Sequence, residues 1–237
     1  MTKIKCMLVL FIIFTGSLFS QLDIGTHAGL TISNGKYVGQ ALFWTPIDPE
    51  WTTRDYEVRI KSESSFSFGG LIETKLYSFL YFQVEVNYLY HKLHPAQIMF
   101  FQGNERTLLT SSLEYRFRYI EVPLLLKIKF DYNKFLPYCF AGVGIGLLNK
   151  ATEKTEYQSP WLNFPPTEDD VSQYTKHEQS FVTLGIGTDY LLSDMFSIFL
   201  TMKYSNSLVD IAKAHNVNFK PHNYDVLLGI KTRIINY

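Results

Sequence analysis

The sequence predicts an all-β protein, an eight-stranded antiparallel transmembrane up-and-down β-barrel, and three observations support this. Apolar and polar residues alternate with a period of two over segments of strand length, short and long connections alternate between these segments, and aromatic residues crowd one end of them. A period of two places successive side chains on opposite faces of a strand, and alternating loop lengths are typical of outer-membrane barrels. A soluble barrel shares the periodicity but has no reason for the alternation of loop lengths.

Residues 1–20 have the layout of a secretory signal peptide. Two lysines precede an apolar stretch from Cys6 to Phe14, and smaller residues follow up to Ser20. The apolar stretch is too short for a stable membrane-spanning helix. We therefore expect cleavage after Ser20, which leaves residues 21–237 as the outer-membrane β-barrel domain.

Eight segments carry the alternation, and they are residues 22–34, 66–76, 81–91, 118–132, 136–149, 179–192, 196–206 and 224–237. In the fourth segment the even positions from Ile120 to Phe130 are apolar, whereas Glu121 and Lys127 occupy odd positions. In a bilayer the apolar face points to lipid, so the odd positions are expected to face the interior. Pro123 shares the inward face and has no N–H to donate, so we expect a bulge or a bound water there.

Charged residues on the inward face are predicted to form a network inside the barrel. The interior of an eight-stranded barrel is just wide enough to be filled by side chains, and an unpaired charge there is costly. Acids and bases are equally numerous on this face, which favours pairing across strands. The predicted lumen network comprises Asp23, Glu73, Lys75, Glu85, Glu121, Lys127, Lys129, Asp189, Lys203, Asp225, Lys231 and Arg233.

The short connections read "YSFL", "NKF" and "SDM", and aromatic residues gather beside them. Aromatic rings are favoured where hydrocarbon meets headgroups, so these residues predict an interfacial girdle. Its expected members are Tyr77, Phe79, Tyr81, Phe82, Phe130, Tyr132, Phe135, Tyr138, Tyr190 and Phe196.

Several function classes are disfavoured by composition and spacing. The chain has 22 basic and 22 acidic residues, so no attraction to nucleic acid is implied. A side-chain-filled interior argues against an aqueous pore. We expect neither a cofactor nor a metal, because His91 and His94 lie on opposite faces of a strand. His27 is interpreted as a hydrogen-bonded interior residue.

An enzyme is the alternative that the histidines and serines of the long connections keep open. A hydrolase needs a serine and a histidine within hydrogen-bonding reach, with a carboxylate orienting the histidine. His177, His215 and His222 lie in or beside long connections, close in sequence to Ser180 and Ser207. No spacing distinguishes them from ordinary loop residues, so we expect no enzymatic activity.

The long connections also contain the candidates for contact with partners. Trp44 and Trp51 flank a proline-containing turn in the first, and Trp161 and Phe164 lie in the third. Rigid rings supply contact area at low entropic cost. The acidic residues 168–170 could attract divalent cations that bridge lipopolysaccharide. Packing over the barrel mouth is an equally good interpretation of these connections.

The segments "GTHAGLTISN", "YFQVEVNYLY", "YIEVPLLLKIKF", "LPYCFAGVGIGLL" and "GIGTDYLLSDMFSIFLTMKYSNSLVDI" resemble the PorT-like outer-membrane β-barrel family of Gram-negative bacteria. The resemblance covers nearly all of the chain after the signal peptide. It implies a porin-like barrel in the outer membrane, in contact with outer-membrane lipid and lipopolysaccharide. Some members of the wider group take part in protein secretion, which implies secretion-system partners for that subset. The aromatic last residue, Tyr237, suits recognition by the barrel-assembly machinery.

Taken together, the sequence leads us to expect a cell-envelope barrel with a structural or interaction role. Two alternatives remain, namely an accessory component of an outer-membrane protein secretion system and a lipid-modifying outer-membrane enzyme.

Overall fold

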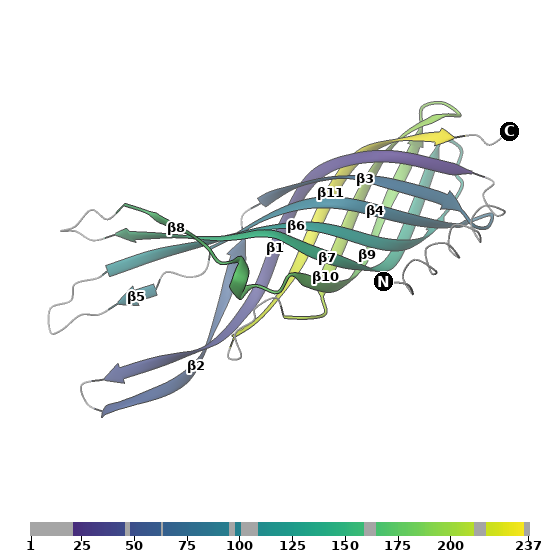
Figure 1. The fold of residues 1–237 in the computed structure, drawn as a ribbon. Helices are drawn as coiled ribbons and strands as arrows, with labels where there is room; N and C mark the ends of the chain where they lie inside the picture. Colours follow the sequence, from purple (N-terminus) through teal and green to yellow (C-terminus); the bar gives the residue numbers. More distant parts are fainter. Residues whose placement is uncertain are drawn as a thin grey trace, which may run out of the picture.

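The computed structural model describes residues 21–45, 48–62, 64–94, 98–100, 109–158, 165–210 and 217–234. In these residues eight antiparallel strands follow one another around a closed barrel, and the last strand pairs with the first (Figure 1). The barrel strands are β1 (Leu22–Thr45), β3 (Ser64–Lys75), β4 (Leu80–His94), β6 (Leu109–Lys129), β7 (Phe135–Gln158), β9 (Glu178–Leu191), β10 (Phe196–Ser207) and β11 (Val217–Ile234). The predicted eight-stranded antiparallel barrel is therefore confirmed.

The strands continue beyond the barrel wall on the side of the long connections, which the sequence analysis did not foresee. There β2 (Asp48–Ser62) pairs with the outer part of β1, β5 (Ile98–Phe100) pairs with β6, and β8 (Thr167–Asp170) pairs with β7 (Figure 1). A long connection that folds back on its own strand satisfies backbone hydrogen bonds, so the ribbons extend past the predicted strand ends.

The described residues contain one short 3-10 helix, η1 (Ser172–Tyr174), which follows β8. No helix among them is long and apolar enough to cross a membrane.

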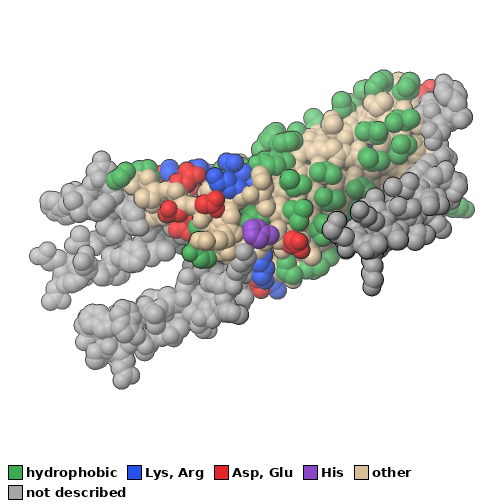
Figure 2. All heavy atoms as spheres, in the orientation of Figure 1, with side chains coloured by type: hydrophobic (Ala, Val, Ile, Leu, Met, Phe, Trp, Pro, Cys, Tyr) green, Lys and Arg blue, Asp and Glu red, His purple; other side chains and the backbone are tan. Residues whose placement is uncertain are grey.

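The outer wall of the barrel is apolar, as the alternation predicts. Exposed hydrophobic side chains include Ile24, Leu30, Phe66, Ile72, Leu124, Leu126, Val143, Ile145, Ile186, Leu200, Leu228 and Ile230. Figure 2 shows hydrophobic side chains over the barrel and charged ones gathered where the strands extend beyond it. An apolar outer face with a polar inner face is the arrangement that a bilayer requires.

Three tight connections close the opposite end of the barrel. In the 76–79 turn the amides of Leu76 and Tyr77 both donate to the carbonyl of Leu80. Residues 130–134 place Asn133 at a φ of 58°, in the left-handed region that asparagine tolerates better than most residues. Neighbouring antiparallel strands can be joined by turns as short as these.

Two of the aromatic residues expected in the girdle point into the barrel instead. Tyr81 and Tyr138 are buried, whereas Tyr77, Phe130 and Phe135 are exposed at the same end. Tyr81 and Tyr138 share the inward face of their strands with charged residues, so alternation places them in the lumen. The girdle prediction was wrong for these two residues.

Pro123 leaves the strand register intact, which corrects the expected bulge. On one side it pairs with Gly144 of β7 without a shift. On the other side the β4–β6 ladder is interrupted between Val84–Leu124 and Asn87–Glu121, and it resumes in the same register. The missing N–H of proline therefore interrupts the hydrogen bonding locally without inserting a residue.

Glycines on the inward face make room for large neighbouring side chains. A Cβ on Gly144 would lie 2.3 Å from the ring of Phe181, and one on Gly187 would lie 2.5 Å from the ring of Tyr138. The barrel is narrow, so each large side chain lies over a strand position that has no side chain. The glycine repeat of β7 thus belongs to the packing of the interior.

Candidate functional site

The half of the lumen nearer the short turns contains five buried charged residues from four strands. They are Glu73 of β3, Lys127 and Lys129 of β6, Asp189 of β9 and Lys231 of β11. We call these five residues the lower network. Successive strands of a closed barrel direct their inward side chains toward one axis, which is why residues so distant in sequence meet.

The two carboxylates of the lower network each contact more than one lysine. The Glu73 carboxylate accepts hydrogen bonds from Lys127, at 3.0 Å, and from Lys129. The Asp189 carboxylate accepts a hydrogen bond from Lys129 at 2.7 Å. The ammonium of Lys231 lies 2.8 Å from each of the two Asp189 oxygens and donates to both. Lys231 also lies 3.4 Å from Glu73. The five charges therefore form one connected cluster across the lumen.

Aromatic rings complete the surroundings of the three lysines, which outnumber the two carboxylates. The Lys127 ammonium lies 3.8 Å from the centroid of the Tyr138 ring, and Lys129 lies 4.5 Å from that of Tyr81. Lys231 lies 4.8 Å from the centroid of the Phe199 ring. The faces of aromatic rings attract cations, most strongly where water is excluded. The two tyrosines that we expected at the interface thus help to hold the excess positive charge.

Further along the lumen the balance of charge is reversed. Here Lys203 of β10 lies 3.5 Å from both Glu85 of β4 and Asp225 of β11. Glu121 also lies at this level and accepts a hydrogen bond from Gln179 at 3.2 Å. We call Glu85, Glu121, Lys203 and Asp225 the upper network. Three carboxylates face one lysine here. The inward-facing acidic and basic residues, which are equal in number over the whole sequence, are therefore distributed unevenly along the barrel axis.

Neutral polar side chains donate further hydrogen bonds to two carboxylates of the upper network. Thr31 donates to Asp225 at 2.5 Å, and Asn87 donates to Glu85 at 2.9 Å. His27 hydrogen-bonds Asn87 through Nε2 at 2.8 Å, which places it in the interior as a hydrogen-bonded residue. A buried charge is tolerated when its hydrogen-bonding capacity is used in this way.

The remaining residues of the predicted network lie at the short-turn rim. Asp23 is buried and accepts a hydrogen bond from Arg233 at 3.3 Å, whereas the Arg233 side chain is 29% exposed. Lys75 is half-buried and lies 6.0 Å from the centroid of the Tyr81 ring. These two cations mark where the lumen meets solvent.

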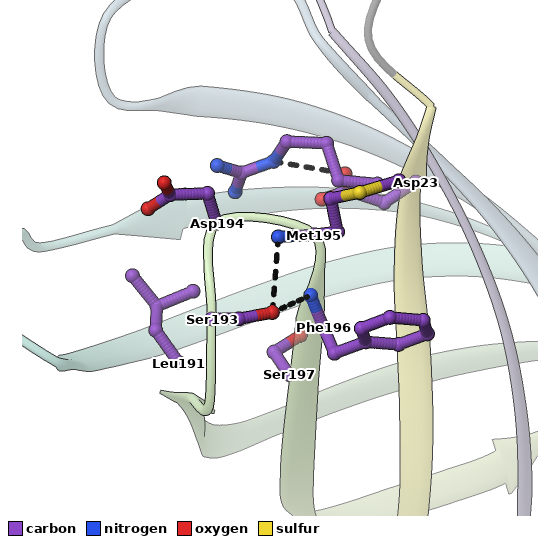
Figure 3. A pocket seen from close by; sticks show the side chains of 8 residues that line it. Asp23, Leu191, Ser193, Asp194, Met195, Phe196 and Ser197 are labelled. Atoms are coloured by element: carbon purple, nitrogen blue, oxygen red, sulfur yellow. Dashed lines mark hydrogen bonds and ion pairs between the residues drawn. The ribbon is translucent and has the colours of Figure 1, made fainter.

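A small pocket lies at this rim, between the Asp23–Arg233 pair and the turn at residues 192–195 (Figure 3). The hydroxyl of Ser193 accepts hydrogen bonds from the amides of Met195 and Phe196, at 3.3 and 3.1 Å, which fixes the turn. The Ser193 hydroxyl is thus occupied by the backbone of its own turn.

A cluster of mostly apolar side chains lies inside the barrel toward the long connections. Leu89, Phe117, Tyr119 and Ala151 form a buried cluster, and Val171 packs on it from the segment between β8 and η1. The Val171 amide donates to the carbonyl of Ala151 at 3.0 Å, which fastens this segment to β7. A non-strand segment therefore covers the lumen at the long-connection end.

Charged residues recur on the extended strands outside the barrel wall. Glu114 lies 2.5 Å from Arg116 and 3.4 Å from Lys92. Burial works to raise the pKa of the Glu114 carboxyl, but the hydrogen bond and charge of Arg116, together with Lys92, hold it below its usual value. Hydrogen bonds from Ser172 hold the pKa of the exposed Asp170 carboxyl low as well.

The residues proposed for partner contact fall largely outside the described part of the chain. Trp161 and Phe164 lie outside the described residues. Trp44 is on β1 and Trp51 is on β2, but their side chains are not among those described. His215 and Tyr237 also lie outside the described residues, as does the signal segment 1–20.

A buried Ser33–His91 pair was missed by sequence reasoning. The Ser33 hydroxyl hydrogen-bonds Nδ1 of His91 across the lumen, and both side chains are buried. Both residues occupy inward-facing strand positions, which was the available signal. However, β3 separates β1 from β4, so the contact depends on the curvature of the wall. No carboxylate of the described residues bonds to His91. The described residues also contain no cluster of His, Cys, Asp and Glu that could hold a metal.

Several solved outer-membrane proteins are similar to this chain. The crystal structure of the outer membrane protein OprG from Pseudomonas aeruginosa is similar, with a TM-score of 0.52 at 13% identity, over 92% of this chain and 98% of that chain. The outer membrane protease OmpT from Escherichia coli gives 0.49 at 10% identity, over 90% and 97%. Neisserial surface protein A gives 0.43 at 10% identity, over 89% and 96%.

Likeness at these identities concerns the fold alone. No curated protein sequence matches the chain significantly. The family model of the outer membrane protein beta-barrel domain matches residues 18–213, which is most of the chain. The protein therefore belongs to the outer membrane protein beta-barrel domain family.

Proposed function

We propose that this protein is a non-conducting, non-enzymatic outer-membrane barrel that presents its extended strands for contact with other envelope components. The observation that carries the proposal is the lower network, in which Lys127, Lys129 and Lys231 meet Glu73 and Asp189 in the middle of the lumen. Ion pairs from four strands occupy the space that a channel would need. They also lock the strands together, which suits a rigid platform.

The PorT-like subgroup is the part of the family that we propose for this chain. The segment "YIEVPLLLKIKF" forms the membrane part of β6, and its Glu121, Lys127 and Lys129 belong to the two lumen networks. In the segment "LPYCFAGVGIGLL" the inward glycines accommodate Phe181 and other large side chains. The motifs that carry the resemblance therefore coincide with the interior of the barrel.

A barrel of this kind has three expected partners. We propose that it contacts outer-membrane lipid and lipopolysaccharide through its wall, and that the barrel-assembly machinery inserts it after removal of residues 1–20. Sequencing the N-terminus of the mature protein tests cleavage after Ser20. An accessory role in an outer-membrane secretion system is the second candidate, and the ribbons formed by β2, β5 and β8 favour it because they extend the sheet beyond the wall.

Planar-bilayer recording tests the closed interior. The purified barrel is expected to give no stable conductance above that of a protein-free bilayer, while a general porin recorded in parallel conducts. Large and stable openings would contradict the proposal, because the ion pairs would then leave a water-filled path.

Co-purification tests the choice between a stand-alone barrel and a secretion accessory. Outer membranes are solubilised in mild detergent, and the tagged barrel is isolated with whatever remains bound. Discrete partners at fixed stoichiometry favour the accessory role, whereas isolation of the barrel alone favours the stand-alone platform. Incubation with lipid A, followed by mass spectrometry, tests the absence of enzymatic activity, since release of an acyl chain would contradict it.

A further inference from the structure

Two basic residues face each other on the outer surface of the barrel. Arg118 of β6 and Lys150 of β7 are register partners in the antiparallel ladder, and both side chains are exposed. Residues that are directly opposite in such a ladder have Cβ atoms about 5 Å apart, and like charges at that separation are destabilising. The arrangement therefore calls for an anion.

A β-bulge produces this pairing. From Lys129–Tyr138 up to Tyr119–Leu148 the β6–β7 register is constant, and without a shift Asn149 would be the partner of Arg118. The register shifts at this point, so that Asn149 is the extra residue and Lys150 takes the place opposite Arg118. Bulges commonly re-aim a side chain at a functional position. Here the bulge brings a second cation beside the first.

The chain neutralises a comparable pair nearby. Lys92 and Arg116 are also register partners, one outward position further along β4 and β6. The Glu114 carboxylate lies 3.4 Å from Lys92 and 2.5 Å from Arg116, and the Glu168 carboxylate lies 3.7 Å from Arg116, so two acids accompany the two cations. A like-charge pair in this part of the sheet is thus supplied with an acid by the protein itself.

Arg118 and Lys150 have no such acid within the described part of the chain. No described carboxylate lies within 4.0 Å of either cation, and neither side chain hydrogen-bonds another described residue. Glu178 is exposed on β9 beside Leu147, and Asp170 is close enough for Lys150 to affect its pKa, but neither forms an ion pair with the two cations. The compensating anion must therefore come from outside these residues.

The pair lies at the edge of the apolar wall. Ile120 and Leu147 are the next outward residues toward the short-turn end, and both are exposed hydrophobic side chains. Two residues along a strand span about 7 Å, which places the cations at headgroup depth beside the last hydrocarbon-facing positions. Because the long connections of such barrels are extracellular, this edge faces the outer leaflet.

We propose that Arg118 and Lys150 form a binding site for the phosphate group of a phosphorylated glycolipid of the outer leaflet. The planar guanidinium of Arg118 donates two parallel hydrogen bonds to phosphate oxygens, and the Lys150 ammonium supplies a second point charge. The acyl chains of the same lipid lie along the apolar wall below, past Ile120 and Leu147. One ligand then neutralises the two like charges with its phosphate and covers the exposed hydrophobic surface with its acyl chains.

Native mass spectrometry of the full barrel in neutral detergent tests this site, with bisphosphorylated lipid A as the probe. The wild-type protein is expected to bind lipid A and to bind its fully dephosphorylated form roughly tenfold more weakly, since charge-assisted contacts are lost. The double variant Arg118→Gln/Lys150→Gln is expected to show a similar loss for lipid A. Lys134→Gln, an exposed lysine in a turn at the opposite end, serves as the control and should bind as wild type.

Three results would overturn the proposal. One is equal affinity of the wild-type barrel for the two lipids, which requires no variant. Another is an unchanged affinity for lipid A in the double variant. The third is an equal loss in the Lys134→Gln control, which would show that binding follows total charge. Heat-modifiable migration on a gel, checked for each variant, ensures that folded barrels are compared.

Discussion

The ammonium of Lys231 lies 2.8 Å from both oxygens of the Asp189 carboxylate, although 42 residues separate them in the sequence. Lys231 is on β11 and Asp189 on β9, so the contact spans β10 and crosses the lumen. Both side chains are buried. The pair therefore depends on the curvature of the wall formed by β9, β10 and β11, which turns both side chains into the lumen.

Replacing Lys231 by methionine is expected to destabilise the barrel by about 1–3 kcal/mol, because both oxygens of the buried Asp189 carboxylate lose a hydrogen-bond donor while Lys129 still bonds to one of them. Urea unfolding in lipid vesicles, followed by heat-modifiable migration, measures the free energy of unfolding. The double variant Lys231→Met/Asp189→Leu should be less stable than Lys231→Met alone, because the buried Lys127 and Lys129 then share Glu73 as the one carboxylate left in the lower network. A smaller cost than that of exposed Lys134→Met would contradict the role given to the network.

Gly144 is expected to resist substitution because the Phe181 ring occupies the place of its side chain. Gly144→Ala should cost about 1–3 kcal/mol of stability, the usual penalty of overpacking. Gly70→Ala is the matched control, since a Cβ there would meet only the carbonyl oxygen of Gly25, at 3.7 Å. In a Phe181→Leu background the cost of Gly144→Ala should shrink, and an unchanged cost would exclude this contact as its cause.

Acid should loosen the extended part of β4 and β6 through Glu114. Its carboxyl has a lowered pKa in the folded state, so the pairing with Arg116 and Lys92 stabilises the fold above the unfolded pKa. This contribution is lost as the pH falls through the folded pKa. Relative to its intrinsic rate at each pH, hydrogen exchange of the amides around residues 114–116 should accelerate over that range. In Glu114→Gln the acceleration should disappear; if it persists, another group is responsible.

Ser33 is expected to be unreactive toward fluorophosphonate probes despite its hydrogen bond to His91. Its side chain is 1% exposed, and no described carboxylate orients the histidine as hydrolytic catalysis requires. Mass spectrometry of the probe-treated, folded barrel checks for an adduct. A labelled Ser33 would count against the non-enzymatic proposal, and Ser33→Ala supplies the unlabelled reference.

The alternation along each strand was enough to predict the barrel and the direction of its side chains. The segment 118–132 illustrates this. Its even positions from Ile120 to Ile128 face outward, whereas Glu121, Lys127 and Lys129 face the lumen. A strand has a fixed period of two, and a bilayer requires the lipid-facing side of each strand to be apolar. Local sequence therefore determined the faces before any tertiary contact was known.

Only the tertiary structure decided which inward residues meet. The equal numbers of acidic and basic residues did not predict that three lysines gather near Tyr81 and Tyr138, or that three carboxylates surround Lys203. The bulge at Asn149, which sets Lys150 opposite Arg118, was equally hidden. The register between strands and the closure of the sheet fix these positions, and both arise from hydrogen bonds between segments distant in the chain. Such contacts leave no periodic trace in the sequence.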